Sequence, residues 1–80
     1  MSNAERILAI LSRVAPTDVV KDQPDLELYE LAILDSLRTV ELMAAFSAEL
    51  GVEVSPAELE REEWATPARI VRYIEGRLGP

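Results

Sequence analysis

The stretch "YELAILDSLRTVELM", residues 29–43, contains one serine at the point where an apolar segment gives way to a helical pattern. From Ser36 to Leu50 apolar residues recur at helical spacing, and Gly51 suits the position directly after a helix. We therefore expect a helix that begins at Ser36 and ends at Leu50. Either Asp35 or Ser36 would cap it by accepting hydrogen bonds from free backbone N–H groups.

Local signals predict two further long helices. Apolar spacing favours a first helix over residues 4–15, ended by Pro16, and a last helix over residues 67–78, closed by Gly79 and Pro80. We expect their apolar residues to face the core: Ile7, Leu8, Ile10, Leu11 and Val14 in the first helix, and Ile70, Val71, Ile74 and Leu78 in the last.

A serine–proline and a threonine–proline pair predict two more helix starts. Ser55 would cap a short third helix that runs through about Glu62, with Pro56 at its first position and Glu58 completing a capping box. Thr66 would cap the last helix in the same way. The sequence therefore predicts an all-α fold, a small bundle of three long helices plus one short helix, with a long first loop.

Residues 16–35 form that loop, with one short turn expected around residues 28–31. A segment of this length without regular structure is uncommon in a compact domain and is usually functional. We expect its apolar side chains to fix it to the core: Leu26, Leu28, Tyr29, Leu31, Ile33 and Leu34.

Length and charge indicate one small acidic domain. The 80 residues suffice for a single core, so we expect one domain over residues 1–80 with an ordered core over residues 5–78. Fifteen acidic residues against eight basic ones give a formal charge of −7, which repels nucleic acid and attracts basic protein surfaces. No apolar run approaches the roughly 20 residues needed to span a bilayer. We expect a cytoplasmic monomer that neither binds nucleic acid nor inserts into a membrane.

Two absences bear on chemistry. The chain contains no cysteine, and so it has no disulfide, thiolate nucleophile or zinc–thiolate site of its own. It also contains no histidine, the usual general base and commonest metal ligand. We therefore expect no metal site and no autonomous enzyme.

The helix expected over residues 36–50 has two apolar faces at about 100° per residue. The face expected to join the core contains Leu42, Met43, Phe46 and Leu50, with Thr39. The opposite face contains Leu37, Val40 and Ala44, with Arg38 and Glu41 beside them. Either the long loop folds over this second face, or the face docks a partner protein.

Ser36 has two interpretations from the residues alone. As an ordinary cap, its replacement by alanine would lower stability by about 1 kcal/mol without loss of function. As a reactive group, it has no histidine to activate it, so another protein's active site must drive any chemistry at its hydroxyl.

The run of loop apolar residues, "LDSLRTVEL", an acidic amphipathic helix and two capped helices resembles the acyl carrier protein superfamily over residues 5–78. The resemblance implies that Ser36 receives a covalent 4′-phosphopantetheine arm, that Asp35 helps to position it, and that the fold is of the acyl-carrier type. It also accounts for the missing cysteine, because the arm supplies the thiol that forms a thioester.

Two segments, "YELAILDS" (residues 29–36) and "EREEWATP" (residues 60–67), are similar to D-alanyl carrier proteins, the small subunits that work with D-alanine–poly(phosphoribitol) ligase. As an ordinary structural residue, Trp64 would lie at the rim and close the core between the third and fourth helices, and the resemblance is compatible with the same role. The chain departs from the pattern at Ala32, where the family usually has glycine, and at Arg38, where fatty-acid carriers typically have an acidic residue.

The resemblance implies a carrier that holds an aminoacyl group, such as D-alanyl, as a thioester. Its partners would be a phosphopantetheinyl transferase, an amino-acid-activating (adenylating) ligase and a downstream acyltransferase. The expected partner interface contains Leu37, Arg38, Val40, Glu41 and Ala44, and the acidic contacts would be Glu41, Glu49, Glu53 and Glu58. The alternatives are a free-standing acyl or peptidyl carrier of fatty-acid, polyketide or nonribosomal peptide synthesis, and a cofactor-free helical interaction module.

Overall fold

A computed structural model, which describes residues 2–15 and 17–78, shows a small all-α bundle. Its elements, in chain order, are α1 (Asn3–Val14), the one-turn helix α2 (Val19–Asp22), α3 (Ser36–Leu50), the 3-10 helix η1 (Arg61–Trp64) and α4 (Pro67–Leu78). No strand forms within the two described ranges. The predicted fold class and the three long helices are therefore confirmed. The predicted terminating roles of Pro16, Gly79 and Pro80 lie outside the described residues.

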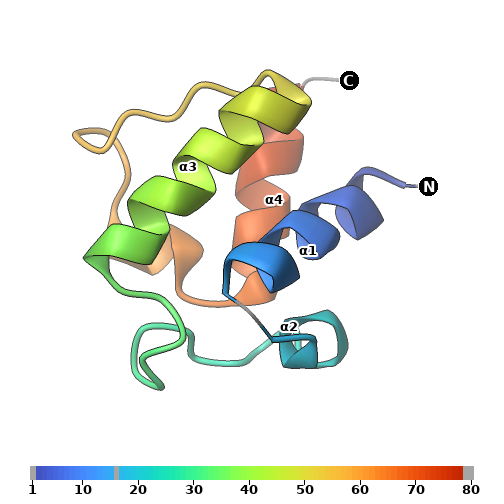
Figure 1. The fold of residues 1–80 in the computed structure, drawn as a ribbon, viewed down its shortest axis with the longest axis vertical. Coiled ribbons are helices and arrows are strands. Elements are labelled where there is room, and N and C mark those ends of the chain that lie inside the picture. The colour runs from blue at the N-terminus through green and yellow to red at the C-terminus, as the bar shows by residue number, and fades with distance from the viewer. Residues whose placement is uncertain (1, 16, 79–80) are drawn as a thin grey trace.

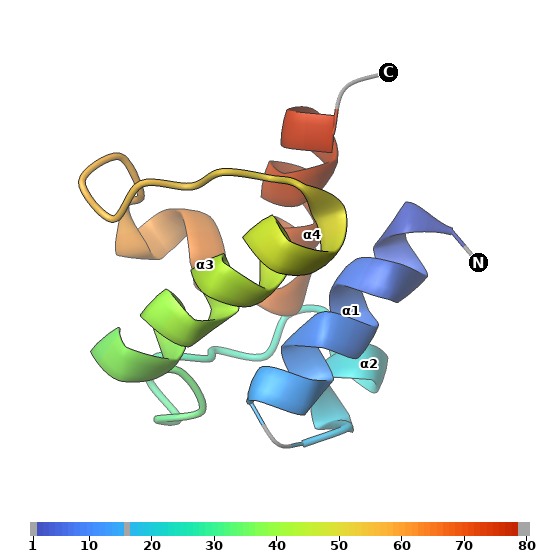
Figure 2. The same ribbon diagram turned by 45° about the horizontal axis from the view of Figure 1, so that its top comes forward.

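The three long helices pack around one core. In Figure 1 the C-terminal end of α4 passes behind the C-terminal end of α3. Helix α1 contacts both of them, and α2 lies below the end of α1 (Figures 1 and 2). The largest fully buried side chains come from every part of the bundle: Ile7, Leu11, Val20, Leu28, Leu34, Leu42, Phe46, Trp64, Pro67, Ile70 and Ile74. Burial of each large apolar side chain stabilises the fold by about 1.5–3 kcal/mol.

Local caps set the ends of the long helices. The Thr66 hydroxyl accepts from the Arg69 backbone N–H at 3.2 Å, as the sequence predicted for the start of α4. At the other end of α3, Gly51 has a φ of 69°, the left-handed conformation that suits the residue after a helix. The expected core faces of α1, α3 and α4 are all directed inward, with the outermost residues of each face half-buried.

Leu28 holds the long first loop in place. Its side chain is fully buried, its N–H donates to the Ala65 carbonyl at 2.8 Å, and its own carbonyl accepts from Ile33 and Leu34. The turn predicted around residues 28–31 is present. One detail of the prediction is wrong, because Leu31 is 57% exposed rather than packed on the core.

The loop also contains helix α2, which the sequence did not predict. This helix is a single turn, and its Val20 side chain is 1% exposed. One turn leaves almost no periodicity to detect, so burial of Val20 against the core decides its conformation.

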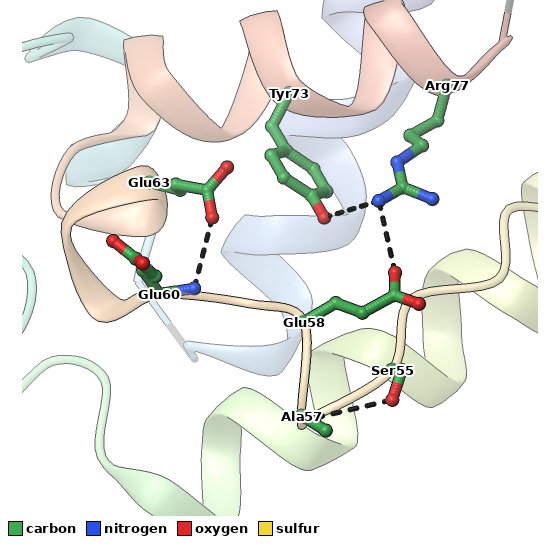
Figure 3. Close-up of polar contacts among 7 residues, drawn as sticks. All are labelled: Ser55, Ala57, Glu58, Glu60, Glu63, Tyr73 and Arg77. Atoms are coloured by element: carbon green, nitrogen blue, oxygen red, sulfur yellow. Dashed lines mark hydrogen bonds and ion pairs between the residues drawn. The ribbon is translucent and has the colours of Figure 1, made fainter.

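The predicted helix over residues 55–62 is wrong. Ser55 accepts from the Ala57 backbone N–H at 3.3 Å, two residues away, and the Glu58 carboxylate pairs with Arg77 of α4 at 3.4 Å instead of completing a capping box (Figure 3). In this segment only Leu59 is half-buried, so a helix there would have no apolar face to pack. The 3-10 helix η1 forms later, where the Glu60 N–H donates to the Glu63 carboxylate at 3.0 Å.

Trp64 lies at the centre of the core. Its side chain is 0% exposed, so the expected position at the rim is wrong. Its ring meets those of Phe46 and Tyr73 edge to face, with centroids 5.7 and 6.1 Å apart. Such pairs add about 0.5–1.5 kcal/mol beyond the burial of area. Trp64 therefore joins η1 to α3 and α4.

Ala32 has a strained backbone conformation. Its φ of 59° lies in the left-handed region, and it is the only non-glycine residue with positive φ in the described part of the chain. A side chain at this φ costs about 1–2 kcal/mol. The departure from glycine noted in the sequence therefore adds strain to the loop.

We expect Ala32→Gly to raise the free energy of unfolding by about 0.5–1 kcal/mol, because relief of the left-handed strain exceeds the added entropy of the unfolded chain. Chemical denaturation measures the change. Ala48→Gly, at an exposed position inside α3, is the matched control and should lower stability by about 1 kcal/mol. A loss of stability in both variants would contradict the assignment of strain to Ala32.

Candidate functional site

Asp35 caps the helix that begins at Ser36. Its carboxylate accepts from the Arg38 backbone N–H at 2.8 Å, and its carbonyl accepts from the Thr39 N–H at 2.9 Å. Its backbone is extended, as a cap residue requires, whereas Ser36 is already the first helical residue. The interpretation of Ser36 as the cap is therefore wrong. Because Asp35 fills that role, the Ser36 hydroxyl is free of it.

The Ser36 hydroxyl differs from every other serine hydroxyl in the chain. All five serines lie in the described ranges, and Ser36 is the one whose hydroxyl makes no hydrogen bond there; its side chain is exposed. The four that hydrogen-bond within the described structure are Ser2, Ser12, Ser47 and Ser55.

A groove of about 230 Å³ lies beside Ser36. Three segments line it, namely the first loop, α3 and the chain around η1, and their residues are Tyr29, Ser36, Thr39, Val40, Met43, Pro56, Leu59 and Arg61. The Tyr29 hydroxyl and Thr39 Oγ1 share a hydrogen bond of 2.8 Å, which fixes the first loop against α3 at the groove. The structure thus places the unengaged Ser36 hydroxyl on a groove lined by both apolar and polar side chains.

The second face of α3 is open. Leu37 is 69% exposed and Val40 51% exposed, and Glu41 and Ala44 are exposed beside them. The alternative in which the long loop covers this face is therefore wrong. Arg38 differs from its neighbours, because it is half-buried and donates to the Val14 carbonyl at the end of α1 at 3.2 Å.

The four expected acidic contacts are in different situations. Glu49 pairs with Arg13, and the hydrogen bond from this guanidinium holds the pKa of the Glu49 carboxyl below its ordinary value. The other two partnered carboxylates, those of Glu53 and Glu58, bind Ser47 and Arg77 respectively. Glu41 forms no ion pair or hydrogen bond through its side chain with any described residue. Among these four, Glu41 alone has its charge unengaged in the described structure.

The described residues contain no group of three or more His, Cys, Asp or Glu that could hold a metal ion. None of the helices in the described ranges is both long and apolar enough to cross a membrane.

Residues 5–74 match the protein family described as "Phosphopantetheine attachment site". The match spans most of the 80 residues, and the chain belongs to this family. Members carry 4′-phosphopantetheine covalently on a serine, and their domains are generally carriers without catalysis of their own. They work with phosphopantetheinyl transferases and with synthetase or ligase partners. The protein is therefore a phosphopantetheine carrier protein.

Two residues that line the groove were not expected from the sequence, Leu59 and Arg61. Arg61 had no assigned role, yet its guanidinium carbon lies 4.6 Å from the centroid of the Tyr29 ring. Leu59 was placed in a helix that does not form. Neither position carries a local signal, because the groove is assembled from segments that are far apart in the chain.

The capping geometry predicts effects of different size for two neighbouring substitutions. Asp35→Ala should lower the free energy of unfolding by about 1 kcal/mol, because it removes the acceptor for the Arg38 N–H. Ser36→Ala should change it by less than about 0.5 kcal/mol, since no hydrogen bond is lost. Denaturation of the two variants tests this, and a larger effect at Ser36 than at Asp35 would reverse the assignment.

Proposed function

We propose that Ser36 is the attachment site of the 4′-phosphopantetheine arm. The observation that carries the proposal is the exposed Ser36 hydroxyl, the one among the five serine hydroxyls that makes no hydrogen bond to a described residue. An arm attached there can extend into solvent or lie along the adjacent groove, so the surroundings of Ser36 fit the group.

In the proposed modification, the Ser36 oxygen attacks the phosphorus of coenzyme A that bears the pantetheine chain. A new oxygen–phosphorus bond forms, the bond to the adenosine-bearing phosphate breaks, and the nucleotide leaves with those electrons. The transferase accepts the proton of the hydroxyl, because the chain has no histidine to do so. When bound, the arm supplies the thiol on which an acyl group is carried as a thioester.

The chain's own residues would position the hydroxyl and the partner enzyme. Asp35 fixes the first turn of α3 through its bond to the Arg38 N–H, and this sets the place of Ser36. The exposed face of α3 is the proposed partner interface, formed by Leu37, Arg38, Val40, Glu41 and Ala44. The Arg38 side chain donates to the Val14 carbonyl, so its main contribution would be to hold this face of α3 against the end of α1.

For the cargo, the proposal is an aminoacyl group, D-alanyl in the first instance, activated by a separate adenylating ligase and passed on by an acyltransferase. The support is the similarity of residues 29–36 and 60–67 to D-alanyl carriers. Most of the matching residues in the second segment shape the packing: Trp64 is buried, Thr66 caps α4 and Pro67 begins it.

The alternative for the cargo remains an acyl or peptidyl group of fatty-acid, polyketide or nonribosomal peptide synthesis, whereas membership of the phosphopantetheine attachment family counts against a cofactor-free interaction module. Loading of the modified protein by a D-alanine-activating ligase, and not by a malonyl transferase, supports the aminoacyl cargo. The reverse result supports the acyl alternative.

We propose that residues 1–80 form a single carrier domain that acts as a monomer. Its cytoplasmic location stays a prediction.

Incubation with coenzyme A and a phosphopantetheinyl transferase should raise the intact mass by one arm, and Ser36→Ala should abolish the gain. Ser47→Ala is the matched control and should be modified normally, because Ser47 is bonded to Glu53. Intact mass spectrometry reads each outcome. The proposal fails if wild-type protein stays unmodified under conditions that modify a known carrier protein.

The partner face can be tested without unfolding the protein. Leu37→Ala should lower the kcat/KM of the transferase by about threefold to tenfold, the effect of losing about 0.7–1.4 kcal/mol of apolar contact. Val19→Ala, at an apolar position 42% exposed on α2, should leave it unchanged. If the transferase modifies Leu37→Ala and Val19→Ala at the same rate, and neither substitution changes the unfolding midpoint, Leu37 is not part of the interface.

A further inference from the structure

Arg61 is an arginine without a carboxylate partner at the groove. Three of the seven arginines, Arg13, Arg69 and Arg77, pair with a carboxylate. The Arg61 guanidinium is one of the four that pair with none in the described ranges, and it lies over the Tyr29 ring. This is notable because three glutamates surround it in the sequence. Two of them are engaged elsewhere: Glu62 with Arg69, and Glu63 with the Glu60 backbone N–H.

A chain of contacts places Arg61 on the same groove as Ser36. Thr39 lies three residues after Ser36 on α3 and therefore on the same side of the helix. The Tyr29 hydroxyl hydrogen-bonds Thr39, and Arg61 stacks on the Tyr29 ring. Among the residues that line the groove, Arg61 is the one with a positive charge, and no acidic residue lines it.

Modification would place a negative charge at Ser36. The attached phosphodiester would lie beside the Asp35 carboxylate, in a chain whose formal charge is already −7. A guanidinium offers a planar pair of donors that matches two phosphate oxygens, and this charge-assisted contact is stronger than an exposed contact with a ring. An unpaired guanidinium on the same groove is therefore available to offset the new charge.

We infer that Arg61 binds the phosphodiester of the arm, exchanging its contact with the Tyr29 ring for the phosphate oxygens once Ser36 is modified. The inference rests on the proposed modification of Ser36. Arg61 is thus a positioning residue, which directs the first part of the arm along the groove between α3 and the chain near η1. Because the contact is ionic and near the surface, salt weakens it and frees the arm for partner enzymes.

The test compares apo and modified protein by NMR for the wild type, Arg61→Gln, Arg61→Lys and the control Arg72→Gln. Arg72 is exposed on α4 and does not line the groove. Intact mass first establishes that each protein carries one arm. The readouts are the phosphorus resonance of the arm and the side-chain Nε–Hε resonance of Arg61, assigned by its loss in Arg61→Gln.

On modification at low salt, the Arg61 resonance should shift in the wild type and in Arg72→Gln. It should return toward its apo position between about 0.01 M and 1 M salt, as the screening length falls from about 30 Å to about 3 Å. The phosphorus resonance should differ between wild type and Arg61→Gln, with Arg61→Lys between them, while Arg72→Gln matches the wild type.

The outcomes separate this inference from the proposed function. Suppose that the arm is added, but the Arg61 resonance does not move and the phosphorus signal of Arg61→Gln equals that of the wild type. This result overturns the role of Arg61 and leaves the proposed function standing. If no arm is added to the wild type, both the proposed function and this role are overturned. The unfolding midpoint of apo Arg61→Gln, compared with that of the apo wild type, shows whether this variant folds. If it does not fold, the comparison of phosphorus resonances is made with Arg61→Lys.

Discussion

Attachment of the first loop through Leu28 is the constraint on which the site depends. A buried side chain alone would fix one point of the loop, but the Leu28 N–H also binds the Ala65 carbonyl just before α4. Its carbonyl accepts from both Ile33 and Leu34, so the chain folds back at once toward α3. Leu28 therefore positions the residues that lead into α3, and the Asp35 cap then sets Ser36 as its first residue. The strain at Ala32 lies inside the same turn, where the chain has little choice of path.

The three long helices and their ends could be predicted because each is specified by nearby residues. Asp35 is the cap of one, Thr66 is the cap of another, and Gly51 supplies the left-handed residue after α3. The sequence left open which of Asp35 and Ser36 is the cap, and the structure assigns that role to Asp35. The family match over residues 5–74 then supports the chemistry that the sequence suggested.

The parts that could not be predicted are those decided by distant contacts. Residues 55–62 carry a local helix signal, but Glu58 is drawn to Arg77 and no apolar face is available to pack. The approach of Arg61 to Tyr29 joins segments about thirty residues apart, and nothing in either segment indicates it. Trp64 shows the same limit, because a lone tryptophan does not reveal whether it lies at the edge or the centre of a core.

Helix α3 combines two demands that conflict in an ordinary surface helix. It buries Leu42 and Phe46 completely, yet leaves Leu37 and Val40 open to solvent. Exposed apolar residues favour self-association, and the formal charge of −7 opposes it through repulsion between copies. Acidity therefore has a physical role here that does not depend on any particular partner contact. The negative charge of the whole surface would also attract a basic partner. On the open face of α3, the carboxylate available to such a partner is that of Glu41, which no described residue engages.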